Sequence, residues 1–251
     1  MLDQPPNVIP PVHDSIVDKW DKEWMLYLST ESKWPHLIQS SKLRVQTDVR
    51  HLQRAEMFLT NLTARIDGSP MGPLRIWATG SEIVGQSIAE IGCGAGFFGK
   101  QIGLVANKYL GIDVSQIALA IARGNSGSNC LYLHLGDQES IVKEYGKYNT
   151  VVGREFFIHQ NFTNANWVLK LAKALLVDGG AVCADFYLPN PDIEQGVLHP
   201  AHSELDPNYA SCAFVFSDDE IRDLTHNVGL SLLSTTDSLD QQRKFVVFRK
   251  D

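Results

Sequence analysis

The sequence has no dense run of lysine and arginine and no long apolar stretch. Nucleic-acid binding depends on clustered positive charge, whereas this 251-residue chain has a net charge of −7. Its apolar stretches fall short of the roughly 20 residues that span a bilayer. The N-terminus holds Asp3, Asp14 and Asp18 where a signal peptide would be basic and then apolar. We therefore expect no nucleic-acid partner, no membrane association and a cytoplasmic location.

Cysteine is also scarce. The four cysteines are isolated from one another and form no C-x-x-C pair, the arrangement that would indicate a zinc site or a disulfide framework. They are Cys93, Cys130, Cys183 and Cys212. Neither a zinc site nor a disulfide framework is therefore expected, and the isolated cysteines fit a protein of a reducing compartment best.

From residue 87 onward, short apolar runs alternate with helical patterns, which is typical of a parallel sheet flanked by helices. We predict strands at 87–91, 109–113, 130–135, 148–153 and 180–186. Between them we predict helices at 97–107, 115–124, 138–145 and 163–176, the last of them closed by Gly179-Gly180.

The C-terminal part departs from this alternation. Ser217 and Glu220 have the spacing of a capping box, and Gly229 follows at the far end of the helix that it begins. Two strand-like runs, 230–235 and 244–250, come next without a helix between them. They are predicted to form a hairpin, so the last strand runs antiparallel to the others.

Two amphipathic helices are predicted before the alternating region, at 14–28 and 45–66, and the breakers of 68–73 follow them. We predict an α/β fold with a doubly wound, seven-stranded, mostly parallel, Rossmann-like sheet whose last strand is antiparallel. Residues 1–80 would form an N-terminal helical cap or lid, and residues 81–251 the core, with an insertion near 188–216 that interrupts the alternation.

The stretch AEIGCGAGFFGK, residues 89–100, places a glycine-rich turn between a strand and a helix. Backbone N–H groups and the positive end of a helix face a ligand at such a turn, and glycines allow its close approach. Gly94 to Gly99 match G-x-G-x-x-G, and Asp113 lies where a ribose-binding acid is expected. A nicotinamide or flavin dinucleotide is therefore one interpretation, and a tight turn without a ligand is another.

The same stretch also contains Glu90-x-Gly92-x-Gly94-x-Gly96, and with this motif the chain from about 87 to 250 resembles the class I S-adenosylmethionine-dependent methyltransferases. A carboxylate beside the loop compensates the ammonium and sulfonium charges of that cofactor, whereas it would repel a pyrophosphate. The antiparallel last strand is also typical of this family and unusual in dinucleotide domains. The methyltransferase interpretation is therefore favoured.

The resemblance implies further contacts with the cofactor. Asp113, with Val114 beside it, would bind both ribose hydroxyls, and Asp137 and Gln138 would meet the adenine edge. Other roles stay open for the two acids, since Asp113 could cap a helix that starts near Ser115 and Asp137 could simply belong to a turn.

The segment GREFFIHQNF, residues 153–162, follows a strand at the edge where open parallel sheets bind ligands. The resemblance places Arg154 and Glu155 near the methionine end of the cofactor. His159 is the first candidate for a general base because its ordinary pKa is near neutrality, and Glu155 is the second. The alternative for His159 is packing against the helix near Thr163. The Asn- or Asp-Pro-Pro-aromatic motif of nucleic-acid base methylases is absent from this segment.

The insertion and the N-terminal cap supply the predicted acceptor site. Trp20 and Trp24 lie at helical spacing and are assigned to the core rather than to a ligand. Arg75 would clamp the methionine carboxylate or lie on the surface, and Trp77 would line the cofactor site. The predicted acceptor contacts are Trp34, Tyr187, His199, His202 and Tyr209.

Together these features predict an S-adenosylmethionine-dependent methyltransferase that acts on a small molecule by in-line transfer to O or N and leaves S-adenosylhomocysteine. No metal is expected, because Asp185-Phe186 replaces the Asp-Asn pair of metal-dependent relatives, although His199 and His202 could join Asp185. The alternatives are a protein or RNA methyltransferase, an NAD(P)-dependent oxidoreductase and a cofactor-binding scaffold. The oligomeric state, a homodimer included, stays open.

Overall fold

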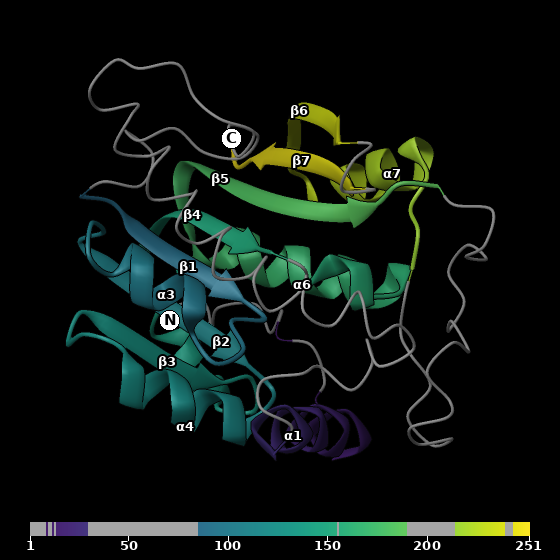
Figure 1. Ribbon diagram of the computed structural model, residues 1–251. Helices are drawn as coiled ribbons and strands as arrows, with labels where there is room; N and C mark the ends of the chain where they lie inside the picture. The colour runs from purple at the N-terminus through teal and green to yellow at the C-terminus, as the bar shows by residue number, and fades with distance from the viewer. Residues whose placement is uncertain are drawn as a thin grey trace.

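Seven strands form one sheet in the computed structural model (Figure 1), which describes residues 9, 12, 14–29, 85–154, 156–189, 214–238 and 243–251. The strands are β1 (Ser87–Ile91), β2 (Lys108–Asp113), β3 (Cys130–His134), β4 (Tyr148–Gly153), β5 (Leu176–Tyr187), β6 (Ser231–Ser238) and β7 (Arg243–Arg249). The helices are α1 (Asp14–Ser29), α3 (Phe97–Ile102), α4 (Gln116–Asn125), α5 (Gln138–Val142), α6 (Phe162–Leu175), α7 (Asp218–Val228) and the 3₁₀ helix η3 (Phe157–His159).

The strand order is β3-β2-β1-β4-β5-β7-β6, which confirms the predicted doubly wound sheet. The first five strands pair in parallel, while β7 pairs antiparallel with both β5 and β6. Parallel strands must all end at the same edge, and the order reverses between β1 and β4. Ligands of open α/β sheets bind at that reversal, outside the carboxyl ends of the strands.

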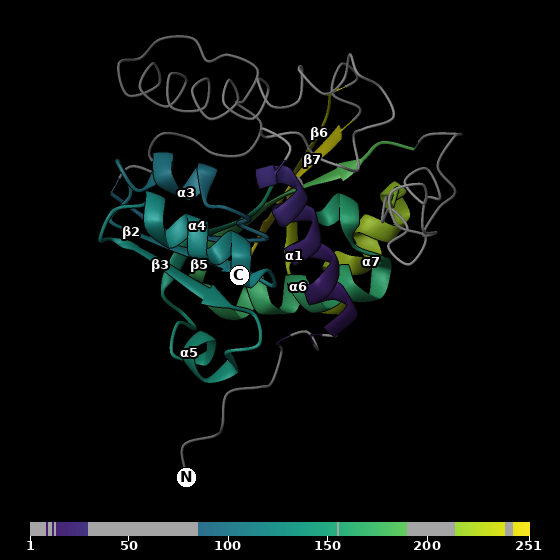
Figure 2. The ribbon, with the colours of Figure 1, turned by 60° about the horizontal axis from the view of Figure 1, so that its bottom comes forward.

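Helices cover both faces of the sheet (Figures 1 and 2). Helices α6 and α7 share one apolar cluster with inward-facing residues of the strands, to which they contribute Leu169, Leu175 and Leu224. Phe98 and Leu119 bring α3 and α4 into a second cluster on the opposite face. The near-continuous burial of the central strands is typical of a parallel sheet with both faces covered.

The start of β5 differs from the prediction. Helix α6 ends at Leu175 and β5 begins at Leu176, whereas the sequence predicted a strand only from residue 180 and a helix closed by Gly179-Gly180. Leu175 and Leu176 are both fully buried, so the apolar pair continues the core across the junction without a loop. Gly179 instead lies inside the strand, with a φ of 76°, where the register between β4 and β5 shifts.

Two predicted helices are shorter than their periodicity suggested. The helix predicted over 97–107 ends at Ile102, and the helix predicted over 138–145 ends at Val142. Gly99 and Gly103 weaken the first of these helices, because glycine has a low helix propensity. The predicted helix at 45–66 and residues 190–213 of the predicted insertion lie outside the described residues. Among the described helices, none has the length and apolar character needed to cross a bilayer.

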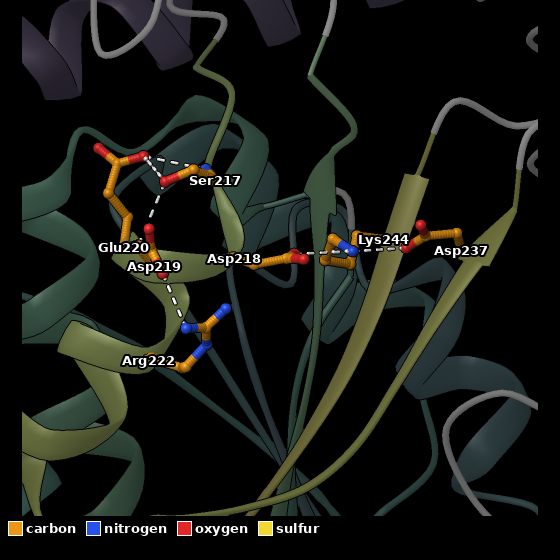
Figure 3. A network of polar contacts seen from close by, with 7 residues as sticks. All are labelled: Ser217, Asp218, Asp219, Glu220, Arg222, Asp237 and Lys244. Atoms are coloured by element: carbon orange, nitrogen blue, oxygen red, sulfur yellow. Dashed lines mark hydrogen bonds and ion pairs between the residues drawn. The ribbon is translucent and has the colours of Figure 1, made fainter.

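The capping box at the start of α7 is confirmed (Figure 3). Glu220 N–H donates to Ser217 Oγ at 3.2 Å, and Ser217 N–H donates to Glu220 Oε2 at 2.9 Å. Gly229 ends the helix in a left-handed conformation, with a φ of 66°. Both ends of α7 are therefore fixed by local side-chain and backbone chemistry.

Replacing Ser217 should destabilise the protein through this cap. Ser217→Ala leaves an N-terminal N–H group of α7 without its acceptor, and the free energy of unfolding should fall by about 1 kcal/mol. Urea denaturation would measure the difference. Asn227→Ala, an exposed change on the same helix, is the matched control and should leave the stability nearly unchanged. Equal stability of the two variants would show that the cap contributes little.

Candidate active site

The glycine-rich loop joins the end of β1 to the start of α3. Gly92, Gly94 and Gly96 have φ values of 75°, 52° and 73°, a conformation that residues with a Cβ rarely adopt. A Cβ at Gly94 would come within 2.7 Å of the Trp24 ring, and one at Gly96 within 2.7 Å of Tyr132 Oη. The glycines therefore serve the turn and the packing of the loop against the protein itself, besides any close approach of a ligand.

Asp113 ties this loop to the end of β2. Its Oδ2 accepts a hydrogen bond from Gly94 N–H at 2.8 Å, and its Oδ1 accepts one from Ser115 N–H at 2.9 Å. Burial raises the pKa of Asp113, and these backbone donors oppose the rise. The alternative that Asp113 caps α4 is wrong, because Ser115 is the N-cap and accepts from Ala118 N–H at 3.1 Å.

The Asp113 carboxylate still has acceptor capacity for a ligand. An ionised carboxylate offers about four lone-pair positions, and two of them receive the Gly94 and Ser115 donors. The others suit a pair of neighbouring hydroxyls. The side chain is partly exposed at the carboxyl edge of the sheet, where such a pair could reach it.

Glu90 lies on β1, two residues before the loop, and is 2% exposed. The Tyr109 hydroxyl donates a hydrogen bond to its carboxylate. Burial raises the pKa of Glu90 to about 7, the positive charge of Arg154 and the Tyr109 hydrogen bond lower it, and the nearby Asp113 raises it further. A cation bound at the loop would favour the ionised form of Glu90 and lower this pKa.

Asp137 acts as a helix cap in the structure. Its Oδ1 accepts from Ser140 N–H at 3.2 Å at the start of α5, and hydrogen bonding with Ser140 lowers the pKa of Asp137. This is the turn role that the sequence left open for Asp137. Gln138, the first residue of α5, is exposed, and the adenine contacts of both residues stay predictions.

His134 is a residue that the sequence did not single out. Gly136 N–H donates to His134 Nδ1 at 3.0 Å, so the proton lies on Nε2, which donates to the Val114 carbonyl at 2.8 Å. The imidazole thereby joins the end of β3 to the residue that follows Asp113. It fixes the backbone on the side of the site where the adenine end of the cofactor is predicted.

Helix α1 packs on the loop from outside the sheet, beside α4 (Figure 2). Trp24 is 5% exposed and packs against Ala95 and Ala118. Asp21 Oδ1 accepts hydrogen bonds from Ser115 Oγ at 2.5 Å and from Ile117 N–H at 3.2 Å. The assignment of Trp24 to the core is therefore confirmed, and the core that it joins includes the glycine loop.

The segment after β4 brings two predicted site residues to the same edge. The Arg154 guanidinium lies over the Phe98 ring at 5.2 Å, and its Nε is buried without a hydrogen-bond partner in the described part of the chain. His159 ends η3, and its ring meets the edge of Trp20 at 5.3 Å between centroids. Helix α6 has its own cap, Asn161, so the packing alternative for His159 involves α1 rather than the start of α6.

The last predicted residue that the structure describes is Tyr187, at the end of β5, with the Arg243 guanidinium 3.9 Å from the centroid of its ring. Asp185 Oδ2 lies 3.4 Å from Arg243 Nε. No group of three His, Cys, Asp or Glu side chains within the described ranges is arranged to hold a metal ion. The remaining predicted site residues lie outside the described ones: Trp34, Arg75, Trp77, Glu155, His199, His202 and Tyr209.

Comparison with known proteins gives likenesses of structure only. No model of a protein family and no curated protein sequence matches the chain. Magnesium protoporphyrin IX methyltransferase from Synechocystis PCC 6803 with bound S-adenosylhomocysteine matches at 15% identity and a TM-score of 0.61, over 94% of this chain and 98% of that one. The same enzyme with bound S-adenosylmethionine matches at 15% identity and a TM-score of 0.60, over 96% and 99%.

A further match covers a smaller part of the chain. An S-adenosylmethionine-dependent methyltransferase from Mesorhizobium loti matches at 15% identity and a TM-score of 0.52, over 67% of this chain and 93% of that one. These likenesses confirm the predicted resemblance at the level of the fold. The chain has the fold of the class I S-adenosylmethionine-dependent methyltransferases.

The pKa of Glu90 leads to a prediction about stability. Its ordinary value is 4.5 and its value in the folded protein is about 7, so between these values the folded state binds the extra proton. The stability that this group contributes is therefore present at low pH and is lost as the pH rises through 7. Glu90→Gln, which stays neutral, should be more stable than the wild type at about pH 8, by roughly 3 kcal/mol at most.

Thermal unfolding of the ligand-free protein at several pH values would measure this difference. The two proteins should converge at about pH 5, where Glu90 is protonated in the folded state. Asp178→Asn, which removes an exposed carboxylate at the far end of β5, is the control and should show no such trend. A constant difference between Glu90→Gln and wild type at every pH would contradict the raised pKa.

Proposed function

We propose that the protein is an S-adenosylmethionine-dependent methyltransferase that methylates a small molecule at oxygen or nitrogen. The observation that carries this proposal is the glycine loop between two carboxylates, Glu90 in the β1 strand and Asp113 hydrogen-bonded to Gly94. A cationic sulfonium nucleoside is stabilised between such acids, whereas a dinucleotide would bring its diphosphate to the same loop and be repelled.

The described residues fit the cofactor. The free acceptor positions of Asp113 would receive the two ribose hydroxyls, with Val114 beside them and Asp137 and Gln138 toward the adenine. Arg154, whose buried Nε has no described partner, would meet the methionine end. Glu90 would compensate the positive charge. When bound, the cofactor supplies a methyl group on a sulfonium, ready for in-line displacement.

The protein's own part in the reaction is to place the acceptor and to remove its proton. His159 follows β4, next to Arg154 in the predicted site, and its ring is positioned by the edge contact with Trp20. An imidazole in this place would accept the proton of a hydroxyl or amine as the new bond forms. Glu155 remains the second candidate for this role.

A small-molecule acceptor is favoured over a macromolecule by two observations. The net charge of −7, without a basic surface run, disfavours RNA. Two solved structures that match over nearly the whole chain are of an enzyme named for a small tetrapyrrole substrate, magnesium protoporphyrin IX. The three described cysteines, Cys93, Cys130 and Cys183, are free thiols, which supports the proposed cytoplasmic location.

Isothermal titration with S-adenosylmethionine, S-adenosylhomocysteine and NADH would test the class of ligand. Binding of the two sulfur nucleosides without NADH is the expected result. Binding of NADH alone would reject the proposal in favour of an oxidoreductase. A screen of small acceptors, proteins and RNA with a labelled methyl donor would then identify the acceptor class, and binding without any transfer would indicate a scaffold.

Asp113→Ala should weaken binding of S-adenosylhomocysteine by about 1–3 kcal/mol, because two ribose hydroxyls and the Gly94 N–H lose their acceptor. Titration calorimetry would measure the affinity. Asp223→Ala on the exposed side of α7 is the control and should bind like the wild type. Unchanged affinity of a folded Asp113→Ala protein would remove this carboxylate from the site.

His159→Ala should lower the rate of methyl transfer by about 100-fold if the imidazole is the general base. The affinity for S-adenosylhomocysteine should stay the same, since the change removes proton transfer and not cofactor contacts. His226→Ala, on the exposed side of α7, is the matched control. If the folded His159→Ala enzyme keeps its full rate, the reaction proceeds by positioning alone.

A further inference from the structure

Arg243 is a largely buried arginine at the carboxyl edge of the sheet. It begins β7 directly opposite Tyr187, the last residue of β5, and its side chain is 13% exposed. The guanidinium carbon lies 3.9 Å from the centroid of the Tyr187 ring. This contact holds the planar group against an aromatic face and leaves its N–H edges to make hydrogen bonds.

The Nε–H group of this guanidinium has no hydrogen-bond acceptor among the described residues. Arg243 Nε is fully buried and donates no hydrogen bond. Asp185 Oδ2 lies 3.4 Å from Nε and forms an ion pair with it, without hydrogen-bond geometry. A guanidinium has five N–H donors, and burying them without acceptors is unfavourable. The arrangement is therefore suited to an acceptor that arrives from outside the chain.

Lys244, the next residue along β7, is a buried cation that has carboxylate partners within the protein. Lys244 points to the opposite face of the sheet, and its side chain is 8% exposed. Its Nζ lies 3.0 Å from Asp218 Oδ1 and 2.6 Å from Asp237 Oδ1 (Figure 3). Two carboxylates thus surround Lys244 with hydrogen bonds. Arg243 is buried to a similar degree, but among the described residues its one ion pair is the contact with Asp185.

Arg243 also lies on the side of the sheet where an acceptor is expected. Gly153 at the end of β4 pairs with Ala184, so Arg154 comes next to Asp185 on the neighbouring strand. Arg154 Nε is likewise buried without a described hydrogen-bond partner. The acids of the proposed cofactor site belong to β1 and β2. Arg154 directly follows β4 and Arg243 begins β7, so the two arginines lie on either side of β5.

We propose that Arg243 binds a carboxylate of the methyl acceptor, with Tyr187 and Asp185 holding the guanidinium in place. An arginine fork and a carboxylate form two parallel hydrogen bonds, which orient the ligand as well as bind it. The proposal rests on the proposed function and narrows its substrate class to small anionic molecules. The same chemistry could come from the carboxylate of the cofactor's methionine, and the experiment separates the two sources.

The test uses benzoate as the probe and benzamide as its uncharged counterpart. Both are titrated calorimetrically into the full-length protein saturated with S-adenosylhomocysteine. Benzoate should bind more tightly than benzamide to the wild type, and Arg243→Gln should weaken benzoate binding roughly tenfold or more. Arg249→Gln, the same change at the exposed far end of β7, is the matched control and should bind benzoate like the wild type.

Three results would overturn the proposal. They are equal binding of benzoate and benzamide by the wild type, equal benzoate binding by Arg243→Gln and wild type, and a loss of S-adenosylhomocysteine affinity in Arg243→Gln. The last would assign Arg243 to the cofactor. If Arg243→Gln does not fold, Arg243→Lys takes its place, and its benzoate affinity should be lower because ammonium lacks the planar fork.

The proposed function is tested separately in the same titrations. Failure of the wild type to bind S-adenosylhomocysteine would reject the methyltransferase. The comparison of benzoate with benzamide would then be made on the ligand-free protein, and it would still decide whether Arg243 forms an anion site.

Discussion

The carboxylate of Asp113 is the interaction on which the site depends. It joins Gly94 in the loop after β1 to Ser115 at the start of α4, through two backbone donors. Ser115 in turn donates to Asp21 of α1. One side chain at the end of β2 therefore connects the glycine loop, the neighbouring helix and the N-terminal helix, and it keeps acceptor positions for a ligand at the point where they meet.

Charge is divided along the carboxyl edge of the sheet. Glu90 and Asp113 lie at the β1 and β2 side, where burial raises the pKa of both groups and a cation would relieve their repulsion. Arg154 and Arg243 lie at the β4 and β7 side, each with a buried Nε that no described residue accepts from. Arg154 acts on Glu90 and is proposed to meet the methionine end of the cofactor, whereas Arg243, beyond β5, is proposed to bind a negatively charged acceptor. The methyl donor and the acceptor would thus meet over the middle of the sheet.

Much of this fold could be predicted from local pattern. Strand periodicity, the capping box of Ser217 and the glycine loop each depend on residues close together in sequence, and the doubly wound sheet agrees with the family resemblance. The start of β5 was predicted too late because Gly179 was treated as the end of the preceding helix. In the structure the strand already begins at Leu176, whose side chain is fully buried. The contacts of His134 with Val114 and of Arg243 with Asp185 were missed because these partners are distant in the sequence and only the fold brings them near.

The indole of Trp24 has a further consequence. Its ring lies so close to Gly94 that a Cβ there would approach it to 2.7 Å, and it is almost completely shielded from water. The chain has five tryptophans, and this one touches the turn at which a nucleoside would settle. The protein therefore contains an intrinsic fluorophore at the proposed ligand site, and its emission would register occupancy of that site without any added dye.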